Sequence, residues 1–140
     1  MNEFILLPAG RAVPPVKFWW IIWAANLSGL VMLYAVVGHG PVKLVTVNDL
    51  PLNLAGLVPL FVSIVIRWLV LPRSVDIKWA FYLFLVGVVL AETCGILGVF
   101  LGGPYRDSLF VLGALGIAQY VPFYAKKLFD PKGAGFIPNN

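Results

Sequence analysis

Charged residues are scarce in this sequence. Only 11% of its 140 residues are Asp, Glu, Lys or Arg, whereas 61% are hydrophobic, and the mean hydropathy is +0.94. Soluble globular domains typically have about 25% charged residues. The scarcity excludes an ordinary soluble domain and indicates an integral membrane protein, with residues 1–140 forming one membrane domain.

Groups that perform catalysis or bind metals are equally few. The single cysteine, Cys94, cannot form an internal disulfide or a thiolate metal site alone, and the single histidine, His39, has no acidic or thiol neighbour. The sequence has no phosphate-binding glycine loop, no paired catalytic carboxylates and no nucleophile beside a base. We therefore expect a protein that is not an enzyme and that needs neither a metal nor a cofactor.

Four apolar segments are long enough to cross a bilayer, which needs about 20 apolar residues per helix. They predict an all-α polytopic protein, a bundle of four transmembrane helices. Pro59 predicts a kink in the second helix. Four aromatic residues at the start of the first helix are typical of an interfacial belt; they are Phe18, Trp19, Trp20 and Trp23. The predicted helices cover about residues 17–38, 52–71, 79–102 and 108–125, and the Pro-, Gly- and Asn-rich tail 126–140 is not expected to continue the last one.

Basic residues near the segment ends predict the orientation, because Lys and Arg are retained on the cytoplasmic side. The N-terminal segment, the second loop and the tail carry most of them: Arg11, Lys17, Arg73, Lys78, Lys126, Lys127 and Lys132. The first and third loops carry only Lys43 and Arg106. Both termini are therefore expected in the cytoplasm, with the protein in the cell membrane, which we expect to be a bacterial inner membrane. The net charge of +4 comes from these basic residues, which orient the chain and contact anionic lipid. We therefore expect no nucleic-acid partner.

The first loop is the longest connection between the predicted helices. Its apolar residues alternate at Val42, Leu44, Val45 and Val47. We expect this stretch either to lie on the membrane face or to pair briefly as a strand.

One carboxylate, Glu92, interrupts the apolar run VVLAETCGILGVFLGG. At about 1.5 Å per helical residue it lies roughly 20 Å from Lys78, somewhat past the middle of the membrane. A glutamate side chain is too short to reach the interface from there, so it must face other helices or water, or be protonated. Glu92 is the candidate proton-binding or coupling residue.

Small residues recur on one face of the same helix. Their spacings of four, four, three and four residues let another helix approach closely. Glu92 follows Ala91 and therefore lies about 100° around the helix from it, on the flank of this face. The residues are Gly87, Ala91, Gly95, Gly98 and Gly102.

Polar residues at a similar depth on the other helices could reach Glu92. Each of these helices offers at least one hydrogen-bonding group: Asn26 and Ser28 on the first, Ser63 on the second and Gln119 on the fourth. They form either an internal network centred on Glu92 or ordinary local hydrogen bonds. Arg67 either snorkels to the cytoplasmic interface and lipid or pairs with Glu92, directly or through water.

The stretch LAETCGILGVFL, residues 90–101, resembles the proton-binding helix of the proteolipid, the c or K ring subunit of rotary ATPases. The resemblance implies that Glu92 takes the place of the ion-binding carboxylate, with Gly95 and Gly98 at the small packing positions. It covers about 12 of the 140 residues, and Pro59 and Arg67 depart from what a rotor ring tolerates. LVGVVLAETCG, residues 85–95, is similar to the first helix of small multidrug resistance transporters, which implies a coupling role for Glu92; here that helix stands third in order.

Two functions follow from these patterns. The first is a small non-catalytic subunit of a larger membrane complex, possible partners being other membrane subunits or further copies of the chain, in a complex that could handle protons. The alternative is a homo-oligomeric proton-coupled transporter of ions or small molecules that uses Glu92. No internal repeat is evident, so a transporter built from inverted repeats would require oligomerisation.

Overall fold

The computed structural model describes residues 14–42 and 49–125, and every regular element in these ranges is helical. Two helices, α1 (Val16–Val37) and α4 (Ile77–Leu101), are long and apolar enough to cross a membrane. Their bounds agree within two residues with the predicted helices 17–38 and 79–102. The all-helical prediction is confirmed. The N-terminal segment, the alternating stretch of the first loop from residue 43 and the tail 126–140 lie outside the described residues.

The second apolar segment is not one kinked helix, which corrects the prediction of a continuous helix over 52–71. It consists of α2 (Leu50–Asn53), a turn over residues 54–56, and α3 (Leu57–Val65). Pro59 falls in the first turn of α3, where a missing N–H is tolerated, so the chain breaks before the proline and not at it. A methyl group on Gly56 would lie 2.9 Å from the carbonyl oxygen of Cys94, and this glycine therefore lets the turn approach α4.

The second segment continues beyond α3 with two unusual turns. A π-helix, Ile66–Val70, is followed by a 3₁₀ turn, Leu71–Arg73. π-helical turns are rare and often occur at functional sites, and this one carries Arg67. The N-cap of α4 is Asp76, whose carboxylate accepts a hydrogen bond of 3.0 Å from the backbone N–H of Lys78.

The fourth apolar segment forms a shorter helix than predicted. α5 (Arg106–Ala118) ends before residue 125. Val121 has left the helical conformation (ψ 123°) ahead of Pro122, because the helical conformation is disfavoured for a residue that precedes proline. Gly103, with φ 51°, opens the 3₁₀ turn Gly103–Tyr105 that joins α4 to α5.

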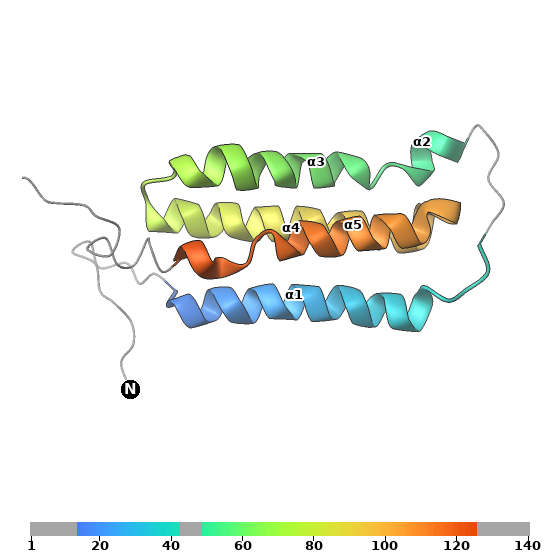
Figure 1. The fold of residues 1–140 in the computed structure, drawn as a ribbon, viewed down its shortest axis with the longest axis horizontal. Helices are drawn as coiled ribbons and strands as arrows, with labels where there is room; N and C mark the ends of the chain where they lie inside the picture. Colours follow the sequence, from blue (N-terminus) through green and yellow to red (C-terminus); the bar gives the residue numbers. More distant parts are fainter. Residues whose placement is uncertain (1–13, 43–48, 126–140) are drawn as a thin grey trace, which may run out of the picture.

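Helix α4 lies at the centre of the structure. Figure 1 shows α3 and α1 on opposite sides of the pair formed by α4 and α5, and α4 contacts all three of these helices. Ten residues of α4 are buried, compared with two of α1. The central helix therefore organises the bundle, while α1 presents most of its surface to the surroundings.

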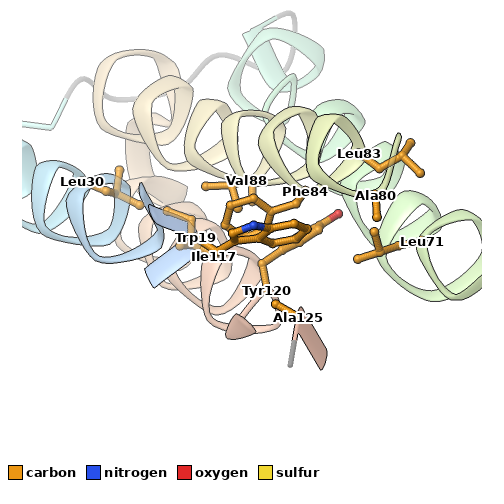
Figure 2. Packing of buried hydrophobic residues seen from close by; sticks show 11 residues of the cluster. Trp19, Leu30, Leu71, Ala80, Leu83, Phe84, Val88, Ile117, Tyr120 and Ala125 are labelled. Atoms are coloured by element: carbon orange, nitrogen blue, oxygen red, sulfur yellow. The ribbon is translucent and has the colours of Figure 1, made fainter. Parts of the chain in front are cut away.

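The core near one end of the bundle is aromatic. Trp19 is fully buried, with ring centroids 5.0 Å from Phe84 and 5.1 Å from Phe81, and Figure 2 shows it beside Phe84 and Tyr120. Nε1 of Trp23 donates a 2.9 Å hydrogen bond to the carbonyl of Ile117. The belt predicted at the start of the first helix is therefore corrected for these two tryptophans, which hold α1 against its neighbours.

The opposite end of the bundle is closed by a polar link between α1 and α5. The Tyr34 hydroxyl donates a 2.8 Å hydrogen bond to the Asp107 carboxylate, and the Tyr34 ring stacks on Phe110 at 4.0 Å. This hydrogen bond is the largest influence that lowers the pKa of Asp107. Arg106 adds a 2.8 Å bond from Nη1 to the carbonyl of Gly40. The link ties the start of α5 to the end of α1.

Candidate functional site

Glu92 lies where α4 meets α1, half-buried, within an apolar helix. It is about 22 Å along the helix axis from Ile77 and about 13 Å from Leu101. A methyl group on Gly29 of α1 would lie 3.8 Å from its Oε1, which places the carboxyl group beside the backbone of α1. Among the described residues, no side chain or backbone group hydrogen-bonds to it.

The part of α1 at and near Gly29, beside Glu92, carries small exposed residues. On α1, Ala25, Ser28 and Gly29 are exposed. The Ser28 hydroxyl donates a 2.6 Å hydrogen bond to the carbonyl of Ala24. On α4, the Thr93 hydroxyl bonds to the carbonyl of Val89 at 2.7 Å. Both hydroxyl groups are therefore satisfied within their own helices, and neither bonds to Glu92.

The small residues predicted on α4 lie in helix contacts. Added methyl groups would meet Leu30 of α1 at Gly95 (2.6 Å) and Leu109 of α5 at Gly98 (2.5 Å). At Gly102 one would collide with the carbonyl of Gly98 and the backbone of Arg106. Ala91 is fully buried. These residues let α4 pack closely against α1 and α5.

Two glycines of α5, which were not singled out from the sequence, complete this contact. A methyl group on Gly113 would lie 2.6 Å from the backbone nitrogen of Gly95, and one on Gly116 would lie 2.9 Å from Cβ of Ala91. Their three-residue spacing, within a predicted helix, was the signal that could have identified them.

Ser63 takes part in a buried polar cluster that does not include Glu92. Its Oγ donates a 2.7 Å bond to the carbonyl of Gly87, and the Tyr120 hydroxyl donates a 2.6 Å bond to the carbonyl of Ser63. Gly87 is required because a side chain there would collide with Tyr120. This cluster joins α3, α4 and the chain after α5.

Arg67 lies where the π-helical turn meets the end of α5. Its Nε donates a 2.6 Å bond to the carbonyl of Gln119, which the end of α5 leaves free. Its guanidinium lies 4.7 Å from the ring centre of Tyr124 and 5.3 Å from that of Trp68. Trp68 in turn donates to Oε1 of Gln119 at 3.1 Å. Within the described residues Arg67 forms no ion pair with Glu92.

Asn26 is also engaged locally, since its Nδ2 donates a 2.7 Å bond to the carbonyl of Ile22. Of the two alternatives left open for the polar groups, Asn26 and Ser28 follow the second, ordinary local hydrogen bonds. Ser63, Arg67 and Gln119 bond to groups other than Glu92. Within residues 14–42 and 49–125, no three His, Cys, Asp or Glu side chains are grouped so that they could hold a metal ion.

The buried serine permits a direct test of the polar cluster. We expect Ser63→Ala to lower the free energy of unfolding by about 1 kcal/mol, because it removes the bond to Gly87 across two helices. The measurement is unfolding in mixed micelles, followed by tryptophan fluorescence. Ser28→Ala is the matched control, since its hydroxyl bonds only within α1. Equal effects of the two substitutions would contradict a role for Ser63 in holding α3 to α4.

The resemblances to the proteolipid helix and to the multidrug transporter helix stay predictions. Comparisons of the chain with protein-family models, curated proteins and solved structures find no match.

Proposed function

We propose that this protein is a small non-catalytic subunit of a membrane complex and that a helix of its partner packs on the face formed by α1 and α4. The observation that carries the proposal is the carboxyl group of Glu92. It lies deep in an apolar helix, half-buried beside Gly29, with no hydrogen-bond partner among the described residues. A polar group at such depth needs a partner on a neighbouring helix.

The surroundings of Glu92 suit a helix better than a substrate. Ala25, Ser28 and Gly29 are small and exposed, so a partner backbone can approach closely. Neither of the two cavities described in the structure includes Glu92 among its lining residues. The partner would offer a hydrogen-bond donor to the carboxyl group and small residues to the face around it.

The proposal includes the topology predicted from the loop charges, with four crossings and both termini in the cytoplasm of a bacterial inner membrane. α1 and α4 have the length and hydropathy for two crossings. α5, with 13 residues, is only about 20 Å long, so the fourth crossing requires residues 119–125 as well. The second crossing would combine α3 with the π-helical and 3₁₀ turns that follow it.

Substitution of Glu92 tests the partner contact. We expect Glu92→Leu to weaken the association with the partner about tenfold, because a membrane hydrogen bond contributes about 1–2 kcal/mol and 1.4 kcal/mol is a factor of ten in the association constant. A smaller fraction of the chain should then be recovered in the larger assembly. Glu92→Gln keeps an acceptor and should retain most of the assembly. The measurement is native mass of the complex after gentle solubilisation from its own membrane.

Thr93→Val is the matched control, because the neighbouring hydroxyl bonds only to its own helix and its loss should leave the assembly intact. Recovery of the unaltered protein as a stable monomer would contradict the proposal, and so would an assembly that Glu92→Leu leaves unchanged.

The alternative, a homo-oligomeric proton-coupled transporter, rests on the same carboxyl group, because a group without an internal partner is free to exchange protons. It predicts a different result for Glu92→Gln. The amide cannot carry a proton, so proton flux into vesicles reconstituted with the protein should be lost while the oligomer stays assembled. A heteromeric assembly with unchanged flux would exclude the transporter.

A further inference from the structure

A pocket at the end of the bundle where α4 joins α5 is lined by charged, polar and apolar residues. Its volume is about 420 Å³, within the range of about 300–1,000 Å³ that small ligands occupy. Figure 1 places α2 and the junction between α4 and α5 at this same end. The lining residues that carry the argument are Asp49, Leu52, Asn53, Phe100, Leu101 and Arg106.

Arg106 supplies a positive group to the pocket. Its side chain is only 15% exposed. Nη1 bonds to the carbonyl of Gly40 at 2.8 Å and Nε contacts the Asp107 carboxylate at 3.4 Å, whereas Nη2 makes no hydrogen bond to the described residues. A guanidinium fixed in this way still has a donor for an oxyanion such as phosphate.

Asn53 supplies a second donor. Its side chain is buried, with 7% of the residue exposed, and Nδ2 has no hydrogen-bond partner in the described part of the chain. A buried amide donor without an acceptor destabilises the folded state, because it has lost its hydrogen bonds to water. An oxygen atom of a ligand would remove that destabilisation.

Asp49 gives the pocket a negative group as well. Asp49 is exposed and lines the pocket. Because a carboxylate accepts several hydrogen bonds at once, it can bind an ammonium group in addition to the contact that it makes within the protein. With Arg106 and Asp49 both present, the pocket suits a ligand that carries both charges better than a simple anion.

The remaining wall is apolar and continuous with the outer surface of the bundle. Leu52 is 55% exposed, Phe100 is 60% exposed and Leu101 is 36% exposed. Because this surface is next to the end of α4, where a membrane-crossing helix reaches the interface, hydrocarbon chains attached to the ligand would lie along it.

We propose that this pocket binds the phosphoethanolamine headgroup of a phospholipid. Arg106 and Asn53 hold the phosphate, Asp49 accepts hydrogen bonds from the ammonium, and the acyl chains lie on the apolar wall. The site is independent of Glu92, so its failure would leave the proposed partner contact untouched.

The test is lipid binding by the full-length purified protein, measured by native mass spectrometry and by the rise in melting temperature on titration of each lipid. Phosphatidylethanolamine should bind at least tenfold more tightly than phosphatidylcholine, whose trimethylammonium has no N–H to donate. Phosphatidylethanolamine should also bind more tightly than phosphatidylglycerol, which has no ammonium group. Soluble phosphoethanolamine separates the sources: if it binds as tightly as the lipid, the ligand is the free compound and the lipid proposal is overturned.

Variants locate the site. Arg106→Gln should weaken binding of all three lipids about tenfold, because they share the phosphate. Asp49→Asn should abolish the preference for phosphatidylethanolamine over phosphatidylglycerol. Since Asp49 is exposed, this variant is expected to fold even if Arg106→Gln does not.

The matched controls are Arg73→Gln and Asp76→Asn, which change a basic and an acidic residue of a hollow at the opposite end of α4. Both should keep the lipid preference. Loss of the preference in these controls, or its persistence in Asp49→Asn, would overturn the assignment of the site.

Discussion

Gly113→Ala should destabilise the protein by about 2 kcal/mol. The new methyl group would lie 2.6 Å from the nitrogen and 2.8 Å from Cα of Gly95, and backbone atoms inside a helix cannot move aside as a flexible side chain can. α4 and α5 would have to separate along their closest contact, and overpacking of this kind costs roughly 1–3 kcal/mol, occasionally more. The cost exceeds the gain of about 1 kcal/mol that alanine brings in helix propensity.

Gly29→Ala is the matched control, being the same substitution in a helix of the same bundle. Its methyl group would lie 3.8 Å from Glu92, an ordinary contact, so stability should stay the same or rise slightly. Unfolding in mixed micelles, followed by the fluorescence of the tryptophans, measures both. If Gly113→Ala proved as stable as Gly29→Ala, the close approach of α4 and α5 would be contradicted.

Trp19→Ala should have a comparable or larger effect, about 3–5 kcal/mol, as is typical when a large buried aromatic side chain is truncated. Trp19 is 0% exposed, and its ring contacts those of Phe81, Phe84 and Tyr124. Truncation leaves a cavity between α1 and α4 and removes three aromatic contacts.

The neighbouring Phe18 provides the control for this substitution. Its side chain is 48% exposed, so Phe18→Ala should change the free energy of unfolding by less than about 0.5 kcal/mol. The same unfolding measurement compares the two. If both residues act only as an interfacial belt, the two variants will lose similar, small amounts of stability.

The two long helices could be predicted from the sequence because hydropathy over about 20 residues is a strong signal. The small-residue face of α4 could be predicted too, because Gly95 and Gly98 repeat at helical spacing. The partners of these residues could not. Nothing in the sequence pairs Gly95 with Gly113, since the pairing depends on how the two helices are rotated and shifted against one another.

The polar contacts were harder to predict for a physical reason. Ser63, Arg67 and Tyr120 all donate to backbone carbonyls, and every residue has a carbonyl, so residue types do not reveal the acceptor. Depth alone made Ser63 and Gln119 candidates for a network with Glu92, with local hydrogen bonds as the alternative. Arg67 donates to the carbonyl of Gln119, which is free to accept because α5 ends at Ala118. The dipeptide Val121–Pro122 was the signal in the sequence for that helix end.

The unequal lengths of the helices bear on how the chain enters a membrane. α1 and α4 are each long and apolar enough to cross a membrane, so in the proposed topology each would insert without help from the other helices. α3 carries a proline in its first turn and is followed by an arginine, and α5 has only 13 residues. In the proposed topology α3 would integrate late, after α4 is in place to receive it. Biogenesis would then depend on α4 as a template, and α5, joined to it by a short 3₁₀ turn, would enter with it as a hairpin.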